Sequence, residues 1–572
     1  MNAPVQAGTD PRSALASWLS GRRWWLAVWA VVAVSLLVGV SQGLLPRPLE
    51  THEVFVAQTS REMLARQDWI EPTFNFQPRL KKPPLMYWAV MVGAIATGNE
   101  VAMPPWLARL PSALAGAALV GLTIAIGVAV HGRAAGLLAG LLTVGMLGFA
   151  RYTNNARPEM LYAACCALML LGLVRAWRSA DRSRAQTGWA LLAWAGFGLA
   201  ILAKGPHMPA LMMGGFALFM FLEGERARAL NVLRPMMGLG VMLLTAGPWV
   251  ALIALRSAGE AGLWVDEMLD TGGGERHSIL KWLQPYYLWA VPELVLPWAI
   301  LLPLALMVLV RRHRESLRPA RSLFWVAAIT VLVMQLMPQR RGYYLLPINP
   351  ALSVLMSVGF LAFAHGAARV RRIGWISFAI VLGALAFVIA IGVLSRESKP
   401  VLVACAAGAA ILLLMMALIW RESRRSERSL LALLAVPGAA VVVASSAVGS
   451  SPALHPDSPV AFDRFADEIA ALAGPEDTIA VHTGETGRLV YRLNRKIESL
   501  DSVEDIAAAA VKGPVWLVTP ESRFEGIRAQ VDAVIRASLD VSASDENPLV
   551  LVRCTPLAGG AEGSPQPSTI PP

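Results

Sequence analysis

The chain has 572 residues, of which 56% are hydrophobic and only 16% are charged, and its formal net charge is +11. Soluble domains carry about 25% charged residues, so this composition excludes one large soluble domain. The apolar residues lie in long uninterrupted blocks, and blocks of roughly 17–25 residues can cross a bilayer. The sequence therefore predicts a mainly α-helical, polytopic membrane protein. Its basic residues gather between the apolar blocks, which favours topology-setting loops over a nucleic-acid partner.

Taken in chain order, about thirteen apolar segments are long enough to be read as membrane spans. They are 24–45, 106–131, 136–150, 158–175, 187–203, 206–222, 233–254, 288–310, 323–337, 343–365, 373–394, 401–420 and 429–448. The first of them is expected to remain in the mature protein, because it is longer than the apolar core of a cleaved signal peptide.

Dense arginine clusters lie at 175–184, 226–234, 311–321, 369–372 and 421–428. In an alternating model of the spans they all fall on the same side as the N-terminus. Cytoplasmic loops carry an excess of Lys and Arg, so this side is predicted to be cytoplasmic. An odd number of spans then places the C-terminal region on the outer side.

Two polar segments, 46–105 and 255–287, are predicted to lie on the outer side. In the first, 60–67 is expected to form a short amphipathic helix. The apolar stretch 85–96 is too short to span, so a re-entrant or interfacial helix is expected there.

The composition changes after Ser451, which divides the chain into a membrane domain, 1–451, and a small soluble α/β domain, 452–556. Periodicity predicts helices at 459–472 and 524–535 and buried strands at 478–481, 515–519 and 549–552. The Gly-, Pro- and Ser-rich tail, 557–572, is expected to be disordered.

The first outer segment holds most of the candidate chemistry. Acids at Glu50 and Glu53 follow the first span, and a Lys81-Lys82-Pro-Pro sequence comes later. A carboxylate can deprotonate or orient an acceptor hydroxyl, and a lysine or arginine can stabilise a departing phosphate. This pattern favours a transfer reaction with a phosphate leaving group.

Residues 50–88 resemble the first periplasmic loop of bacterial GT-C glycosyltransferases that use polyprenyl-phosphate sugars. The nearest type is the 4-amino-4-deoxy-L-arabinose lipid A transferase, and the protein O-mannosyltransferases are wider relatives. The matching positions are His52-Glu53, the Ser-Arg-Glu-Met-Leu run at 60–64, Gln67-Asp-Trp, and Lys81-Lys82-Pro-Pro before Tyr87-Trp88. Further similarities follow at Arg109-Leu-Pro-Ser, at Ala156-Arg-Pro-Glu159, at Lys204-Gly-Pro, at Pro248-Trp249, and at Gln339-Arg-Arg-Gly-Tyr-Tyr before Leu-Leu-Pro347.

The chain departs from the family pattern at two positions. His52 stands where the family has its first acid, and Lys81 stands where the family has an acid before the lysine. The resemblance implies catalytic roles for Glu53 and Glu159, with His52 as a candidate base. It implies donor phosphate binding by Lys81, Lys82, Lys204, Arg340, Arg341 and Tyr344. Because one carboxylate is lost and another becomes a cation, the use of a divalent metal stays open.

We therefore expect a multi-pass glycosyltransferase of a bacterial inner membrane, with a cytoplasmic N-terminus and a periplasmic C-terminal domain. It would move a hexosyl, pentosyl or aminoarabinose group from a polyprenyl-phosphate donor to a glycolipid, glycan or protein, with inversion. Two other functions remain open. One is a non-catalytic binding protein of the same fold, which the departures at His52 and Lys81 favour. The other is a transporter or flippase of lipid-linked sugars, although the acids lie at outer span ends rather than mid-span.

Overall fold

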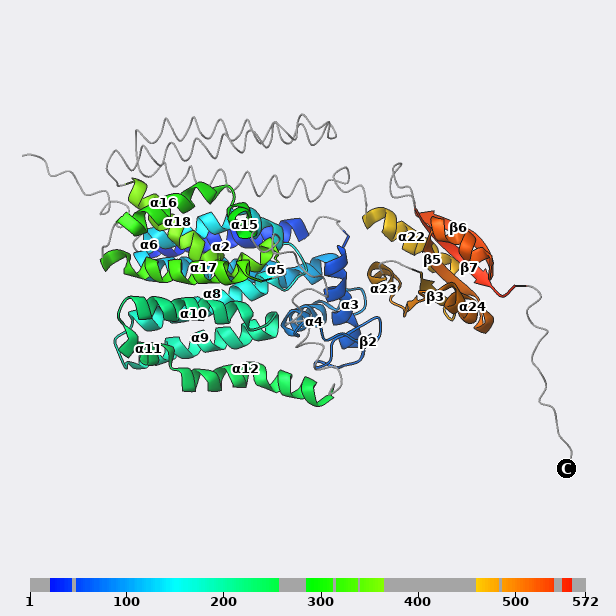
Figure 1. Ribbon diagram of the computed structural model, residues 1–572, viewed down its shortest axis with the longest axis horizontal. Helices are drawn as coiled ribbons and strands as arrows, with labels where there is room; N and C mark the ends of the chain where they lie inside the picture. Colours follow the sequence, from blue (N-terminus) through cyan, green and yellow to red (C-terminus); the bar gives the residue numbers. More distant parts are fainter. Residues whose placement is uncertain are drawn as a thin grey trace, which may run out of the picture.

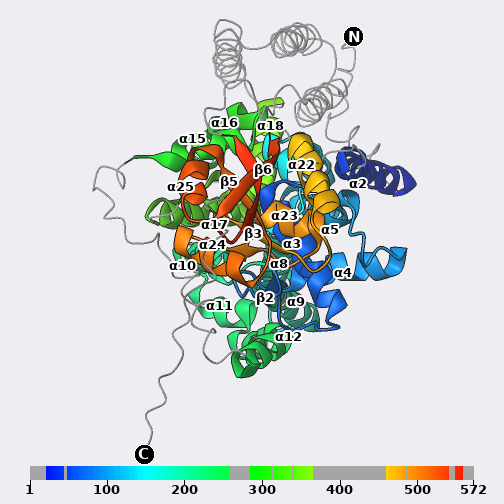
Figure 2. The same ribbon diagram turned by 90° about the vertical axis from the view of Figure 1, so that its right-hand side faces the viewer.

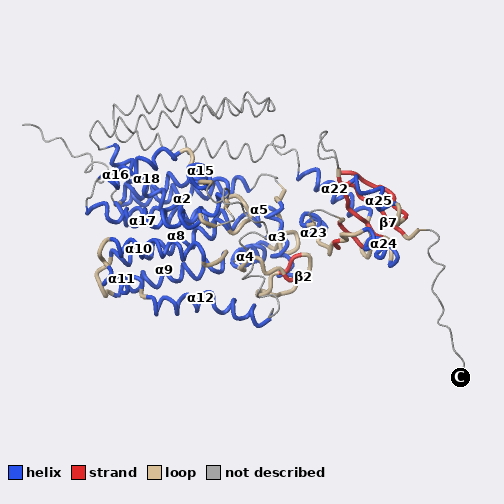
Figure 3. Tube along the Cα trace, viewed as in Figure 1, coloured by secondary structure: helices blue, strands red, loops and turns tan. Residues whose placement is uncertain are grey.

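The computed structural model describes the following stretches of the chain: 21–43, 48–256, 284–311, 315–337, 340–364, 459–482, 486–539 and 548–557. Within them, a bundle of helices is joined at one end to a small α/β domain (Figure 1). The strands of the described residues gather at that end, in the domain and in the loop beside it (Figure 3).

The bundle consists of long apolar helices and of shorter helical segments between them. Seven of the described helical stretches are long and apolar enough to cross a bilayer. The elements are α2 (Gly21–Gly43), α5 (Pro105–His131), α6 (Arg133–Val144), α7 (Leu147–Tyr152), α8 (Glu159–Arg178), α9 (Arg184–Ala203), α10 (His207–Leu222), α11 (Arg226–Leu233), α12 (Pro235–Arg256), α15 (Tyr286–Leu294), η1 (Trp298–Ile300), α16 (Leu301–Arg311), η2 (Glu315–Leu317), α17 (Arg318–Gln335), η3 (Gly342–Ile348) and α18 (Asn349–Ala364). The predicted class, a mainly helical, polytopic membrane protein, is confirmed.

Two of the predicted spans, 136–150 and 288–310, are not continuous helices in the structure. The segment 136–150 is interrupted after α6, where Met146 has an extended backbone. The segment 288–310 is divided into α15, η1 and α16. Proline lacks the N–H that a helix interior needs, and Pro292 and Pro297 both lie in this segment. The predicted spans 373–394, 401–420 and 429–448 lie outside the described residues.

Helices α8 and α9 approach closely because glycines lie at their contact. A Cβ atom at Gly172 would lie 2.7 Å from the backbone nitrogen of Ala193, and one at Gly196 would lie 2.7 Å from that of Met169. Small residues allow such close backbone approach between membrane helices. The two helices are consecutive, so the first turn of α8 lies beside the last turn of α9. This packing brings Glu159 next to Lys204.

The loop between α2 and α5 contains α3 (Thr51–Ala65), the hairpin strands β1 (Thr73–Phe74) and β2 (Gln77–Pro78), and α4 (Leu85–Thr97). The amphipathic helix predicted at 60–67 is therefore longer and begins earlier. Glu50 and Glu53 form a capping box, in which Glu53 Oε2 accepts from the Glu50 backbone N–H at 2.9 Å. Such a box satisfies backbone donors at a helix start, which explains where α3 begins. The short helix predicted at 85–96 is confirmed as α4.

The C-terminal domain is a five-stranded mixed sheet in the order β4-β3-β5-β7-β6, with helices packed beside it. Its elements are α22 (Pro459–Leu472), β3 (Thr478–Val481), α23 (Gly487–Leu493), β4 (Glu498–Ser499), α24 (Val503–Lys512), β5 (Val515–Pro520), η5 (Glu521–Arg523), α25 (Phe524–Arg528), β6 (Asp532–Leu539) and β7 (Leu549–Thr555). β3 pairs in parallel with β4 and β5, whereas β7 pairs antiparallel with β5 and β6. The predicted α/β character is confirmed.

The helix predicted at 524–535 is wrong beyond its first turn. Only α25 is helical there, and β6 begins at Asp532. β6 pairs with β7 from Asp532 opposite Thr555 to Leu539 opposite Leu549. The backbone hydrogen bonds of β6 come from its pairing with β7. The local sequence periodicity of β6 does not depend on β7, so it could not predict this pairing. The tail predicted to be disordered, 557–572, lies outside the described residues from 558 onward.

The C-terminal domain contacts the first loop through a set of hydrogen bonds. Arg61 of α3 is buried and donates to the backbone oxygen of Tyr491 at 2.8 Å and to that of Ala102 at 3.0 Å. The Tyr491 hydroxyl donates to the Met103 carbonyl at 2.9 Å. Asn75 exchanges two hydrogen bonds with the backbone of Ile497, at 2.7 and 2.9 Å. The sheet thus lies against the end of the bundle that carries α3, as the end-on view shows (Figure 2).

Candidate active site

Glu53 lies at the junction of three elements. Its carboxylate is fully buried and accepts from Arg109 Nε at 2.8 Å and from Arg109 Nη2 at 2.7 Å. It also accepts from the backbone N–H of Ala156 at 2.8 Å. The side chain therefore joins α3, α5 and the segment that precedes α8. An enclosed carboxylate with these partners is suited to hold the site in shape rather than to touch a substrate.

Glu159 begins α8 and is buried between two cations. Lys204 Nζ lies 3.2 Å from Glu159 Oε1, and Arg157 Nε lies 3.4 Å from Glu159 Oε2. Among the described residues, Oε2 has no hydrogen-bond partner. Buried carboxylates normally have their hydrogen bonds satisfied. Glu159 Oε2 is therefore an enclosed acceptor whose hydrogen-bonding capacity is unused within the described residues.

Tyrosine rings surround the Lys204 ammonium group. Its Nζ lies 4.9 Å from the ring centre of Tyr344, 5.0 Å from that of Tyr343 and 5.9 Å from that of Tyr162. The Tyr162 hydroxyl donates to the Gly205 carbonyl at 2.9 Å, which holds the turn after α9 in place. Cation–π contact and this turn fix the ammonium group beside Glu159.

Further positive charges converge on this place. Arg157 and Arg341 lie close enough to Lys204 for their charges to repel it. The charges of Lys204 and Lys82 both act on the ring of His207, at the start of α10. Arg341, from the segment before η3, thus lies within electrostatic range of Lys204, and Lys82, from the first loop, lies within range of His207. A cluster with more cations than carboxylates attracts an anion such as a phosphate.

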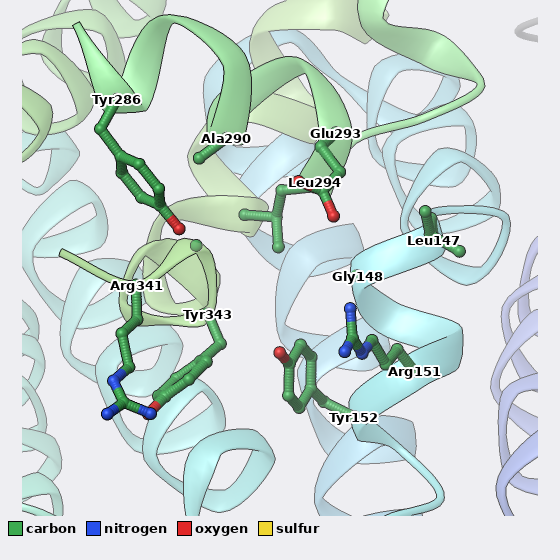
Figure 4. Close-up of a pocket in the computed structure, with 11 residues that line it drawn as sticks. Leu147, Gly148, Arg151, Tyr152, Tyr286, Ala290, Glu293, Leu294, Arg341 and Tyr343 are labelled. Carbon is green, nitrogen blue, oxygen red and sulfur yellow. The ribbon is translucent and has the colours of Figure 1, made fainter. Parts of the chain in front are cut away.

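A half-open cavity of about 410 Å³ lies beside this cluster. It is lined from α7, α15 and η3, and its residues are Leu147, Gly148, Arg151, Tyr152, Tyr286, Ala290, Glu293, Leu294, Arg341, Gly342 and Tyr343. Figure 4 shows Glu293 and Arg151 facing the same space, with Arg341 and Tyr343 along another wall. Tyr343 belongs to both places, because its ring also lies 4.8 Å from the Arg157 guanidinium.

The structure brings together five of the residues predicted from the sequence: Lys82, Glu159, Lys204, Arg341 and Tyr344. Lys81 is exposed, and among the described residues no contact joins it to the cluster. Arg340 donates to the carbonyl of Gln284 at 2.7 Å, so it holds the start of α15. His52 is exposed in the first turn of α3, where its ring centre lies 6.5 Å from that of Phe55.

Arg157, Arg151, Glu293 and Tyr343 were not selected from the sequence. For the two arginines a signal was present. Both lie on the side predicted to be outer, where basic residues are rare, so their position was unusual for arginine. Glu293 and Tyr343 carry no comparable signal, since an acid or an aromatic residue near a span end is common at membrane interfaces.

Metal binding was left open by the sequence. Within the part of the chain that the structure describes, no three His, Cys, Asp or Glu side chains lie close enough together to hold a metal ion. The charged side chains around Glu159 are mostly cations, which repel a metal. The described residues therefore do not fit a resident metal, and no step is derived through one.

Comparison with known proteins gives a match to one family model and matches to several sequence relatives. Residues 81–251 match the family model described as dolichyl-phosphate-mannose-protein mannosyltransferase. An undecaprenyl phosphate-alpha-4-amino-4-deoxy-L-arabinose arabinosyl transferase of Pseudomonas fluorescens is 26% identical over 291 residues, 47% of this chain and 48% of that protein. An uncharacterised protein of Aquifex aeolicus is 26% identical over 310 residues, 53% of this chain and 58% of that protein. The chain spans about half the length of the curated relatives it matches.

The fold has a close counterpart among solved structures. ArnT from Cupriavidus metallidurans, bound to undecaprenyl phosphate, superimposes with a TM-score of 0.75 at 20% identity, covering 93% of this chain and 98% of that one. An oligosaccharyltransferase of Archaeoglobus fulgidus gives a TM-score of 0.50 at 12% identity, covering 89% and 70%. The chain thus shares the fold of ArnT, which is the GT-C fold expected from the sequence.

Proposed function

We propose that this protein, with its GT-C fold, transfers a sugar from a polyprenyl-phosphate donor to an acceptor at the membrane surface. One observation carries the proposal: Lys204 and Arg157 pair with the buried carboxylate of Glu159, while the charge of Arg341 acts on Lys204 and that of Lys82 acts on the neighbouring His207. The sequence relatives that are named arabinosyl transferases, and the ArnT structure with undecaprenyl phosphate, support the same donor class.

The cations would hold the donor phosphate. Lys204 is fixed by Glu159 and by the tyrosine rings, and the charges of Lys204 and of Lys82, from the first loop, both act on His207. Fixed positive charges aimed at the place where charge develops stabilise a transition state without reorganising. The leaving polyprenyl phosphate gains negative charge as its bond to the sugar breaks. These cations would therefore bind it more strongly in the transition state than in the ground state.

Glu159 would orient the acceptor. In a single displacement, an acceptor oxygen forms a bond to the anomeric carbon while the bond from that carbon to the phosphate oxygen breaks. The phosphate keeps the bonding electron pair, and the proton of an acceptor hydroxyl passes to Glu159 Oε2. Attack opposite the leaving group inverts the anomeric centre. Glu53 would act indirectly, through Ala156 N, by holding the segment that carries Arg157 and Glu159.

The sugar and acceptor follow from the relatives' names and from the sequence. Aminoarabinose is named in the arabinosyl transferases and mannose in the family model. Acceptors of the three kinds expected above, glycolipid, glycan and protein, suit a site at the end of the bundle. We place this end in the periplasm of a bacterial inner membrane, because the described parts of the arginine clusters, 175–184, 226–234 and 315–321, lie at the other end of the bundle.

The test is sugar transfer in membranes by the full-length protein and two variants, with radiolabelled polyprenyl-phosphate aminoarabinose and mannose as donors. Glu159→Gln should lower kcat by about 10²–10⁴-fold, the usual contribution of a positioned acid or base. The matched control, Glu525→Gln on the exposed surface of the C-terminal domain, should keep full activity.

Two results would contradict the proposal. Transfer at the wild-type rate by Glu159→Gln would remove this residue from the reaction. Donor binding without transfer by the wild-type protein, with every acceptor supplied, would instead indicate the non-catalytic binding protein that the sequence left open.

A further inference from the structure

The cavity beside Glu159 differs from the cation cluster in its charges. Its wall contains the carboxylate of Glu293 together with the guanidinium groups of Arg151 and Arg341. Glu293 comes from α15 and Arg151 from α7, and both side chains face the cavity (Figure 4). The wall thus offers hydrogen-bond acceptors as well as donors, whereas the cluster offers mostly donors.

The side chains of Glu293 and Arg151 do not stabilise the fold through polar contacts with the described residues. Glu293 and Arg151 are both exposed, and the side chain of neither forms a hydrogen bond or an ion pair within the described part of the chain. The Arg151 guanidinium lies only in loose contact with a ring, 5.8 Å from the centre of Tyr152. Charged groups that face a cavity beside a cluster of cations, and that support no packing, are candidates for contact with a ligand.

A phosphate is a poorer ligand for this wall than for the cation cluster. The carboxylate of Glu293 would repel it, and Lys82, Lys204 and Arg157 offer a better place nearby. A neutral polyhydroxyl ring suits the wall, because each hydroxyl both donates and accepts a hydrogen bond. Glu293 can accept from such a hydroxyl and Arg151 can donate to it. The rings of Tyr152, Tyr286 and Tyr343 supply apolar surface for the C–H groups of the sugar.

Tyr343 connects the two places. Its ring lines the cavity and lies 5.0 Å from Lys204 Nζ and 4.8 Å from the Arg157 guanidinium. A sugar in the cavity would therefore lie directly beside a phosphate held by the cations. The bond that joins sugar and phosphate would then lie near Tyr343 and Glu159. A volume of about 410 Å³ falls within the range of small-ligand sites, about 300–1,000 Å³.

We propose that the transferred sugar binds in this cavity, and that Arg151 and Glu293 determine which sugar is accepted. The inference rests on the proposed function and deepens it, since it names the residues that select the donor. It assigns the phosphate and the sugar of one donor to different walls of the same site. Binding of the phosphate and binding of the sugar can therefore be measured separately.

The experiment compares lipids with and without a sugar. Full-length protein in nanodiscs is titrated with undecaprenyl phosphate, with undecaprenyl-phosphate mannose and with undecaprenyl-phosphate aminoarabinose. The variants are Glu293→Gln and Arg151→Gln, and Glu525→Gln is the matched control on the C-terminal domain. The wild type should bind one sugar-bearing lipid more tightly than undecaprenyl phosphate. In each cavity variant this preference should fall about tenfold or more, because polar groups of the sugar lose their partners. Affinity for undecaprenyl phosphate should change by less than about twofold, which also shows that the variants are folded.

Each other result overturns the inference. An equal loss of affinity for undecaprenyl phosphate would mean that Arg151 or Glu293 binds the phosphate. Unchanged binding of all three lipids, with a raised KM for the acceptor, would place the acceptor in the cavity. If the wild type binds none of the lipids, the proposed function fails too, whereas a wild-type sugar preference that the variants keep overturns this inference alone.

Discussion

The guanidinium of Arg109 and the carboxylate of Glu53 form a two-point contact, 2.7 and 2.8 Å long, between groups that are both buried. Removing one partner of such a pair leaves an uncompensated buried charge, which costs about 3–5 kcal/mol. We predict that Glu53→Leu and Arg109→Met each lower the free energy of unfolding by about this amount. Thermal unfolding of the purified protein measures it.

The double variant separates pairing from packing. Glu53→Leu with Arg109→Met removes both charges, so its loss of stability should be clearly smaller than the sum of the two single losses. Additive losses would show that the two groups act independently, contrary to the contact in the structure. Activity should fall in the two variants that carry Glu53→Leu, since the Ala156 N–H loses its acceptor there.

The glycines between α8 and α9 provide a second prediction. Gly196→Ala places a Cβ 2.7 Å from the Met169 nitrogen, whereas Gly188→Ala, on the same helix, places one in open space. Gly196→Ala should therefore lower the melting temperature and separate Lys204 from Glu159, with loss of transfer. Gly188→Ala should be neutral or slightly stabilising, because alanine favours a helix over glycine. Equal behaviour of the two variants in thermal unfolding would rule out tight packing at Gly196.

The contact between the first loop and the C-terminal domain is expected to be specific. Asn75 has a left-handed backbone, φ 56°, so Asn75→Gly removes its two hydrogen bonds to Ile497 without straining the turn. We predict faster hydrogen exchange across β4 and α23 in this variant. Gln77→Ala, an exposed change in the same hairpin, is the matched control and should leave exchange unchanged. Exchange that is equally slow in Asn75→Gly would mean that this contact does not hold the domain.

A pH dependence follows from Asp68, which joins the first loop to α12. Partial burial raises its pKa, but backbone hydrogen bonds from Ile70 and Glu71, and then the charges of Arg256 and Arg66, outweigh it, so the pKa is lowered from 3.8. A lowered folded-state pKa means that the carboxylate stabilises the protein above pH 3.8, and that this stability is lost as the pH falls further through the folded value.

The variant Asp68→Asn tests this contribution. Wild type should melt at a higher temperature than the variant near neutral pH, and the difference should vanish as the pH falls through the lowered pKa and the wild-type carboxylate is protonated. The difference should be small and should shrink with salt, because Arg256 is about half exposed. A difference that persists unchanged in strong acid would mean that the ionised carboxylate is not its source.

The sequence predicted three of the five strands of the C-terminal sheet, β3, β5 and β7, and it assigned the beginning of β6 to a helix. The segment Thr478–Val481 is strongly apolar and is buried as β3, so burial and local pattern agree. In β6, exposed residues alternate irregularly with buried ones, and the strand exists because β7 lies beside it. Because β6 forms by pairing with β7, from Leu539 opposite Leu549 to Asp532 opposite Thr555, the sequence of β6 alone does not distinguish a strand from a helix.

The candidate site shows the same division. Glu159 and Lys204 were both selected from the sequence, but nothing in the sequence pairs residues that lie 45 positions apart. Their contact depends on the close approach of α8 and α9 at Gly172 and Gly196. Glu53 was selected as a catalytic acid, which stays a prediction. The structure adds its enclosure by Arg109 and Ala156 N, and this favours an indirect role.

The sequence by itself determined the membrane class, most of the spans and the side of the bundle on which unusual cations lie. The length of an apolar segment determines whether it can cross a bilayer, and the Lys and Arg content of the flanking loops determines its orientation. Both properties are local to the segment, so they can be recognised in the sequence. Only the tertiary structure decided which charges are enclosed, which are paired and which face the cavity of Arg151 and Glu293. Helix packing sets these distances, and because electrostatic and hydrogen-bond energies fall off within a few ångströms, it also decides what each charged residue can do.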